Sequence, residues 1–188
     1  MEEKIIDCCP KDRLIERFNK FKENYLYEEE LIKNKYPIRH QNMPEDISEN
    51  IAKFIIRKIE NDNSCIWCKG YNKTLTGDLF SINLNKTIEI KSFTSNGPSQ
   101  FGPGKKFDEL YFLDLRNLIK NDKITLWKTN LNDLSTDFTN IKINKNETLG
   151  QQLEQKRRPH INWDRIYPQI KDSCEKIYDN SFDNIFIN

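Results

Sequence analysis

Two acidic residues and one lysine are the part of this sequence best suited to chemistry. Asp78 is followed, after ten intervening residues, by Glu89-Ile90-Lys91. Mg²⁺ prefers carboxylate oxygens, keeps several waters, and completes its coordination with phosphate oxygens of a substrate. Asp78 and Glu89 are therefore candidate metal ligands, with the main-chain carbonyl of Ile90 as a third. Such a metal and Lys91 would lower the pKa of an attacking water and offset charge on a phosphate, which suits phosphodiester hydrolysis.

A β-hairpin is the element that would bring these residues together. Residues 79–85 and 87–93 are rich in β-forming types and are separated by an Asn-Lys turn. Because side chains alternate along a strand, Glu89 and Lys91 share one face while the isoleucines between them enter the core. Pairing of the two strands would place Asp78 close to that face.

The spacing of these residues resembles the PD-(D/E)XK nuclease signature. The continuation KSFTSNGPSQFGP (91–103) resembles the segment that follows this motif in small type II restriction endonucleases. The likeness covers about residues 44–130 and departs from the signature at Gly77, where the signature has proline. It implies an α/β fold, a restriction-endonuclease-like mixed β-sheet flanked by helices. It also implies Mg²⁺-dependent cleavage of double-stranded DNA at a short palindromic site, a homodimer, and a cognate DNA methyltransferase in the host.

The same residues are compatible with three alternatives. Glu89 and Lys91 could be a solvated pair on an exposed sheet face, which contributes little energy. A repair or junction-resolving nuclease would use the same metal site, but would cut at branches or mismatches instead of at a defined sequence. A non-catalytic DNA-binding module would bind DNA without binding a divalent metal.

A helix from Pro44 to about Ile59 precedes the hairpin. Its apolar residues form one stripe, and acidic residues occupy its first turn. Nucleases of the resembled family often take a further acidic residue from the helix before the metal-binding strands, and Glu49 is the matching candidate. Glu49 lies off the apolar stripe, so a solvent-facing glutamate is an equally good interpretation.

Two polar segments are predicted to contact DNA. Residues 92–106 hold three glycines and two prolines, which favours a shaped loop over a helix. Residues 148–160 end in a basic run, where arginine can bind guanine or phosphate and glutamine can read adenine; a solvated basic turn is the alternative. The DNA-contact candidates are Ser92, Thr94, Ser95, Asn96, Ser99, Gln100, Lys105, Lys106, Gln152, Lys156, Arg157, Arg158 and His160.

The remaining segments supply the core and the packing elements. Residues 130–146 are polar and irregular, which favours a mobile excursion or a subdomain reaching around DNA. An amphipathic helix is predicted at residues 10–22, with Asp7 as a possible cap; residues 25–32 either continue it or start a second helix, as a packing or dimer-forming element. Strands are predicted at 108–115 and 124–131. The last predicted helix, at 163–178, has Ile166, Ile170, Cys174 and Ile177 on one face.

Composition bounds the remaining possibilities. A chain of 188 residues is expected to form a single nuclease domain (1–188) with its catalytic core at 44–131. The net charge of +1 excludes a uniform basic surface, so attraction to DNA must be local. No apolar run approaches the ~20 residues of a membrane span, and the N-terminus does not resemble a signal peptide, so a cytoplasmic location is expected. The odd count of five cysteines argues against a disulfide framework; Cys65 and Cys68 have zinc-ligand spacing, but reduced, packed thiols are preferred.

Overall fold

The computed structural model describes residue 7, residues 9–67 and residues 77–187. Zinc binding by Cys8 or Cys68 therefore falls outside the described residues, and Cys9 and Cys65 are buried thiols. The helices are α1 (Lys11–Lys33), α2 (Glu45–Ile59), α3 (Leu118–Asn121), α4 (Thr136–Thr139), α5 (Leu149–Glu154) and α6 (Trp163–Ile170). The strands are β1 (Cys65–Trp67), β2 (Leu79–Ser81), β3 (Lys86–Phe93), β4 (Ser99–Gln100), β5 (Glu109–Asp114), β6 (Ile124–Thr129), β7 (His160–Ile161) and β8 (Cys174–Asn180).

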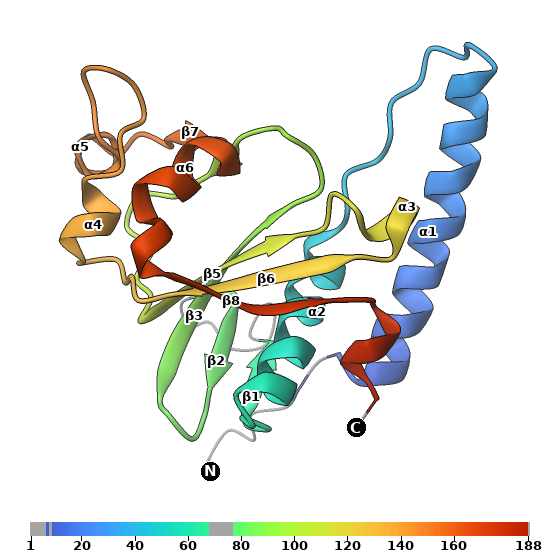
Figure 1. Ribbon diagram of the computed structural model, residues 1–188, viewed down its shortest axis with the longest axis horizontal. Helices are drawn as coiled ribbons and strands as arrows, with labels where there is room; N and C mark the ends of the chain where they lie inside the picture. Colours follow the sequence, from blue (N-terminus) through green and yellow to red (C-terminus); the bar gives the residue numbers. More distant parts are fainter. Residues whose placement is uncertain (1–6, 8, 68–76, 188) are drawn as a thin grey trace.

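A mixed six-stranded sheet forms the centre of the molecule, in the order β1-β2-β3-β5-β6-β8 (Figure 1). All neighbouring strands in it are antiparallel except β3 and β5, which run parallel. A second sheet of two strands pairs β4 with β7. Helices flank the large sheet, so the predicted α/β class with a mixed sheet is confirmed.

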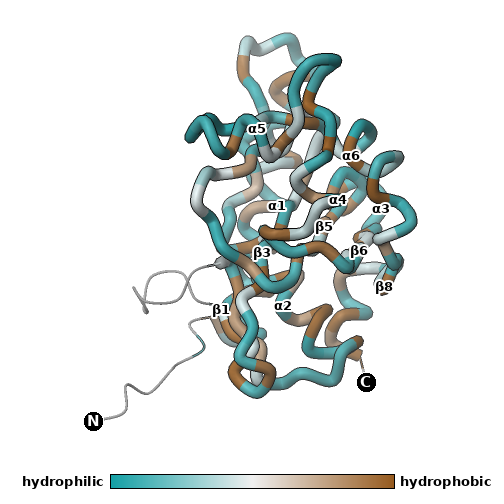
Figure 2. Tube along the Cα trace, turned by 90° about the vertical axis from the view of Figure 1, so that its left-hand side faces the viewer, coloured by the Kyte–Doolittle hydropathy of each residue, from teal (hydrophilic) through white to brown (hydrophobic). Residues whose placement is uncertain are grey.

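Both faces of the large sheet are covered, and β5 shows how. Its side chains alternate between two apolar clusters, because successive residues of a strand point to opposite faces. Tyr111 and Leu113 join the cluster formed with α1 and α2, whereas Leu110 and Phe112 join the cluster formed with the α4–α6 region. In Figure 2 the hydrophobic colours follow the strands of the interior, while the chain around α5 is mainly hydrophilic.

The N-terminal region is one long helix, not two. Residues 25–32 continue the first predicted helix as α1 without a break. Asp7 does not cap it; its carboxylate instead accepts hydrogen bonds from Lys53 at 2.8 and 3.0 Å and from Arg57 at 2.9 Å. Burial lowers the pKa of Lys53, and the hydrogen bonds from Lys53 to Asp7 partly offset that cost. Asp7 thereby ties the N-terminal segment to α2.

The predicted last helix is wrong in its second half. Helix α6 ends at Ile170, and residues 174–180 form the edge strand β8 against β6. Ile166, Ile170, Cys174 and Ile177 have the spacing of one helical face, but residues 174–180 pair with β6, and Tyr178 is buried in the cluster formed with α1 and α2. A tertiary contact therefore overrides the local periodicity.

The polar segment 130–146 is packed instead of forming a free excursion. It contains α4, and Phe138, Ile141 and Ile143 are buried in the cluster below the α4–α6 region. Among the described residues, no helix combines the length and the apolar character that crossing a membrane requires.

Candidate active site

The β2–β3 hairpin fixes Asp78 against the second strand. Leu79 pairs with Ile88, so Asp78 lies one step before the paired residues. Its main-chain N–H donates to the Ile88 carbonyl at 2.9 Å, and its Oδ2 accepts the Ile90 N–H at 2.9 Å. The carboxylate is buried, and the hydrogen bond from the Ile90 N–H holds it against β3.

Gly77 makes this close approach possible. Its φ is +97°, and a Cβ built there would stand 3.0 Å from the Ile88 carbonyl oxygen. Proline is locked near φ −65° and cannot adopt this conformation. The glycine that replaces the proline of the PD-(D/E)XK signature therefore has a structural reason, and it leaves the position of Asp78 intact.

Glu89 and Lys91 project together from the face of β3 opposite Ile88 and Ile90, as alternation predicts. The Lys91 Nζ donates to Glu89 Oε1 at 2.6 Å, and the side chains of Glu89 and Lys91 are 1% and 12% exposed. Because both side chains are this deeply buried, the alternative of a solvated surface pair is wrong. Lys105 joins them: its Nζ lies 2.8 and 3.0 Å from the two oxygens of Glu89 and 3.5 Å from Asp78 Oδ1. The predicted convergence of Asp78, Glu89 and Lys91 is therefore present, with a second lysine that the sequence placed only in a DNA-contact loop.

Glu49 is not a solvent-facing residue of its helix. It is buried on α2, and its Oε2 accepts the indole N–H of Trp67 on β1 at 2.7 Å. One residue earlier, Ser48 accepts a hydrogen bond from Ser92 at 3.2 Å, which docks the first half of α2 on the end of β3.

One cleft of about 650 Å³ is lined by Glu49, Asp78 and both lysines, while Glu89 lines an adjacent pocket of about 340 Å³. Helix α2 contributes Glu45 and Glu49, the hairpin contributes Asp78 and Lys91, and the loop after β3 covers the opposite side. The sequence places Glu45 only in the first turn of its helix, so sequence reasoning missed its place in the site. The full lining is Asn42, Glu45, Glu49, Asp78, Ile90, Lys91, Ser92, Pro98, Ser99, Gln100, Gly102, Pro103, Lys105 and Arg158.

Comparison with known proteins identifies the chain. The profile of the Bsp6I restriction endonuclease family matches residues 11–168. The chain belongs to this family. It is 35% identical over 136 residues to the type II restriction enzyme Bsp6I of Bacillus sp. (strain RFL6), covering 70% of this chain and 67% of that enzyme. No solved structure is significantly similar to this chain. The protein is therefore a type II restriction endonuclease, a site-specific deoxyribonuclease.

The two predicted DNA-contact segments of this endonuclease meet in the small β4–β7 sheet. Gln100 pairs with His160 in the register, and their side chains lie 3.1 Å apart. Arg158 precedes β7 and lines the cleft together with Gln100 and Ser99. A short ribbon from two distant parts of the chain thus borders the site.

Other predicted contacts lie elsewhere. Thr94 and Ser95 line a separate pocket of about 230 Å³, and the Asn96 side chain accepts from Arg116 at 2.8 Å. Gln152 donates to Glu147 at 2.9 Å, and Arg157 forms an ion pair with the same carboxylate.

The remaining two lysines also differ in position from Lys105. Lys106 lines a pocket on the far side of Glu89, and Lys156 is exposed in a turn with φ 56°. Of the predicted DNA contacts, Ser92, Ser99, Gln100, Lys105 and Arg158 are the ones that line the cleft that also holds Asp78 and Lys91.

The donor chemistry at the convergence point fits a divalent cation. Asp78 and Glu89 present hard oxygen atoms to one shared positive group, the ammonium of Lys105. Mg²⁺ commonly binds through one or two carboxylates while keeping water and phosphate oxygens in its remaining positions. Among the residues that the structure describes, no group of three or more His, Cys, Asp or Glu side chains is arranged to hold a metal. A site of two carboxylates completed by substrate is consistent with both observations.

Proposed function

We propose that this endonuclease hydrolyses phosphodiester bonds of double-stranded DNA with Mg²⁺, and that Asp78, Glu89 and Lys91 carry the reaction. The observation that supports this most directly is the meeting of two buried carboxylates, Asp78 and Glu89, with two lysines at the edge of a cleft that Asp78 and both lysines line. The restriction endonuclease family accounts for such a site, whereas a repair or junction nuclease has no particular observation in its favour.

Asp78 and Glu89 would hold the metal, with the Ile90 carbonyl as a further candidate ligand. Bound Mg²⁺ supplies Lewis acidity toward the phosphate and a lowered pKa of coordinated water. The hydrogen bond from the Ile90 N–H keeps Asp78 aimed at this position. Lys91, held against Glu89 on a strand, orients water and offsets the negative charge that develops on the phosphate.

Glu49 is proposed as an assisting acidic residue. Its carboxylate lines the same cleft as Asp78, and the hydrogen bond from Trp67 fixes its orientation. Such an oriented carboxylate can position a water or a metal ligand without itself contacting the metal.

The substrate is proposed to be a short palindromic duplex. Because a two-fold DNA site is matched by a two-fold protein, we expect a homodimer, and a cognate methyltransferase would protect the host DNA. Each protomer would act as one nuclease domain (1–188) with its catalytic core at 44–131, working in the cytoplasm where the DNA is.

Digestion of a sequenced plasmid, with and without Mg²⁺, tests the activity. The proposal expects discrete fragments whose ends map to one palindromic sequence, and only when Mg²⁺ is present. Cutting confined to branched or mismatched DNA would overturn it, as would equal cutting in excess chelator.

Two adjacent arginines test the DNA-contact surface. Arg158 lines the cleft, whereas Arg157 is already paired with Glu147. Arg158→Ala is expected to weaken DNA binding by about 1–3 kcal/mol, measured by titration of duplex DNA at fixed salt. Arg157→Ala removes the same charge one residue earlier and is the matched control. Equal losses in the two variants would mean that only net charge, and not the cleft, matters.

A further inference from the structure

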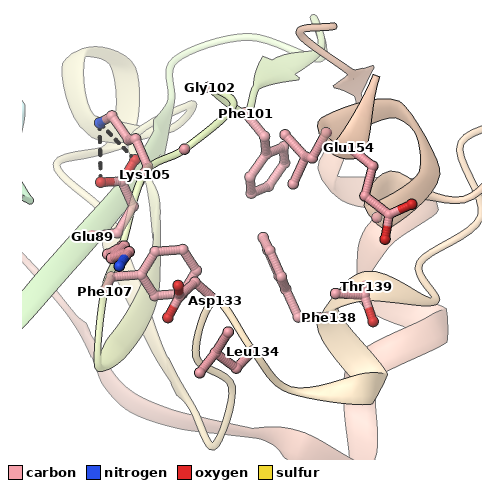
Figure 3. A pocket seen from close by; sticks show the side chains of 14 residues that line it. Glu89, Phe101, Gly102, Lys105, Phe107, Asp133, Leu134, Phe138, Thr139 and Glu154 are labelled. Atoms are coloured by element: carbon pink, nitrogen blue, oxygen red, sulfur yellow. Dashed lines mark hydrogen bonds and ion pairs between the residues drawn. The ribbon is translucent and has the colours of Figure 1, made fainter. Parts of the chain in front are cut away.

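Lys105 lies where the two acidic side chains of the site converge. Its ammonium contacts both oxygens of Glu89, a carboxylate that is 1% exposed (Figure 3). The same ammonium lies 3.5 Å from Asp78 Oδ1. A cation shared by Asp78 and Glu89 would have to lie close to this same point. The ammonium of Lys105 and a metal ion cannot occupy the same point, and a metal placed beside the ammonium would be repelled by its charge.

Lys105 and Lys91 differ in how firmly they are held. Lys91 belongs to strand β3, its side chain is 12% exposed, and its ammonium lies 5.1 Å from the centre of the Phe101 ring. Lys105 belongs to the loop between β4 and β5, and its side chain is 43% exposed. Lysine has a long flexible stem, so the Lys105 ammonium can leave Glu89 without any change in the sheet.

The loop leaves room for that movement. Lys105 lies between the catalytic cleft and a second pocket of about 340 Å³ on the other side of Glu89, and it lines both. Gly102 lies beside its stem, since a Cβ built there would stand 3.6 Å from the Lys105 Cγ. A larger residue at 102 would restrict the stem.

We propose that Lys105 occupies the cation position in the DNA-free enzyme, and that a DNA phosphate entering the cleft draws its ammonium away and opens this position to the metal. The inference rests on the proposed metal-dependent function of Asp78 and Glu89. A phosphate in the cleft would lie near Lys105 and Arg158, which both line it. By thermodynamic linkage, DNA then raises the affinity for metal, and metal raises the affinity for DNA by the same factor. Cutting would require both ligands together.

Mn²⁺ binding without DNA, measured by calorimetry, is the first test. Lys105→Gln is expected to bind Mn²⁺ about tenfold or more tightly than the wild type, because the competing positive charge beside the carboxylates is gone. Lys106→Gln, which removes the same charge one residue along, is the matched control and is expected to change the affinity less than about twofold. An unchanged affinity in Lys105→Gln, or an equal gain in Lys106→Gln, would overturn the proposal. Adding Asp78→Asn to Lys105→Gln should abolish the gain; a gain that survives lies at another site and also overturns it.

The coupling to DNA is tested in a background that cuts slowly. The Mn²⁺ affinity of Lys91→Met and of the double variant Lys91→Met/Lys105→Gln is measured with and without a duplex that contains a mapped plasmid cut site. The gain in affinity on adding the duplex is expected to be about tenfold larger in Lys91→Met than in the double variant. Equal gains would show that Lys105 does not couple the two ligands, and would reject this inference alone. Absence of Mn²⁺ binding in every variant, with and without duplex, would instead reject the metal-binding role of Asp78 and Glu89.

Discussion

Strand β3 carries one cluster of carboxylates and lysines at its first end, around Lys86, and another toward its second end, where Lys91 meets Glu89, and the two clusters differ in how they are completed. At the first end, Lys86 pairs with Glu109 at 2.6 Å, and Lys128 pairs with Glu60 at 2.6 Å. The Tyr111 hydroxyl lies between the two carboxylates, 2.9 Å from Glu109 and 3.4 Å from Glu60. Each carboxylate there has a lysine of its own, which is the arrangement of a structural network.

At the second end, two lysines converge on one carboxylate. Lys91 and Lys105 both contact Glu89, and Lys105 also reaches toward Asp78. This cluster opens into a cleft bordered by polar loop residues, whereas the first joins neighbouring strands to the end of α2. Residue types alone therefore do not separate the structural network from the proposed reactive one. The pairing of partners and the access to a cleft do.

The largest effect on the cleavage rate should appear when the lysines of the two clusters on β3 are replaced one at a time. Lys91→Met is expected to lower the rate of plasmid cleavage about a thousandfold or more, because it removes the positive charge beside the phosphate. Lys86→Met removes a lysine from the other end of the same strand and should leave cleavage within about threefold, because Lys86 pairs with Glu109 and is not among the described residues that line the cleft. Initial rates at saturating Mg²⁺, with thermal unfolding to confirm folding, measure both. Loss of activity in both variants, or in neither, would mean that the ends of the strand are not functionally distinct.

The hairpin was predictable because its signals are local. The turn at Asn85, the alternation through Glu89 and Lys91, and the spacing to Asp78 all follow from strand geometry. The mixed sheet and helix α2 followed from resemblance and from periodicity. The first strand is shorter than predicted, since β2 ends at Ser81.

Contacts between segments far apart in sequence were not predictable in the same way. The pairing of Gln100 with His160 joins residues from the two DNA-contact segments, and no local pattern indicates it. The contact of Lys105 with Glu89 depends on a loop conformation that returns its side chain to β3. Strand β8 was predicted as a helix because its isoleucine spacing fits a helix, while its pairing with β6 depends on the rest of the sheet.

Glu49 tests whether the second cluster extends onto α2. Glu49→Gln keeps the shape and can still accept the hydrogen bond from Trp67, but it loses the negative charge. We expect cleavage to fall about 10- to 100-fold, as is typical for residues that orient or assist metal ligands. Trp67→Phe, which keeps Glu49 charged but removes its donor, should lose less. Measuring both rates over a range of Mg²⁺ concentrations separates weaker metal binding from slower chemistry. An unaffected Glu49→Gln enzyme would confine the site to the hairpin and its loop.

The smallest effect is expected at Glu109, and it should appear in stability only. Burial alone would raise the pKa of Glu109, but hydrogen bonds from Lys86 and Tyr111 outweigh it and hold the pKa below its usual value of 4.5. Glu109→Gln should lower the free energy of unfolding by about 1–2 kcal/mol, measured in urea at neutral pH, with cleavage unchanged. Because the folded-state pKa is lowered, this stabilisation is fully present above pH 4.5 and is lost as the pH falls through the folded-state value. The difference between wild type and variant should therefore shrink in acid. A difference that stayed constant with pH would show that the charge of Glu109 contributes nothing, and that packing alone makes this end of β3 stable.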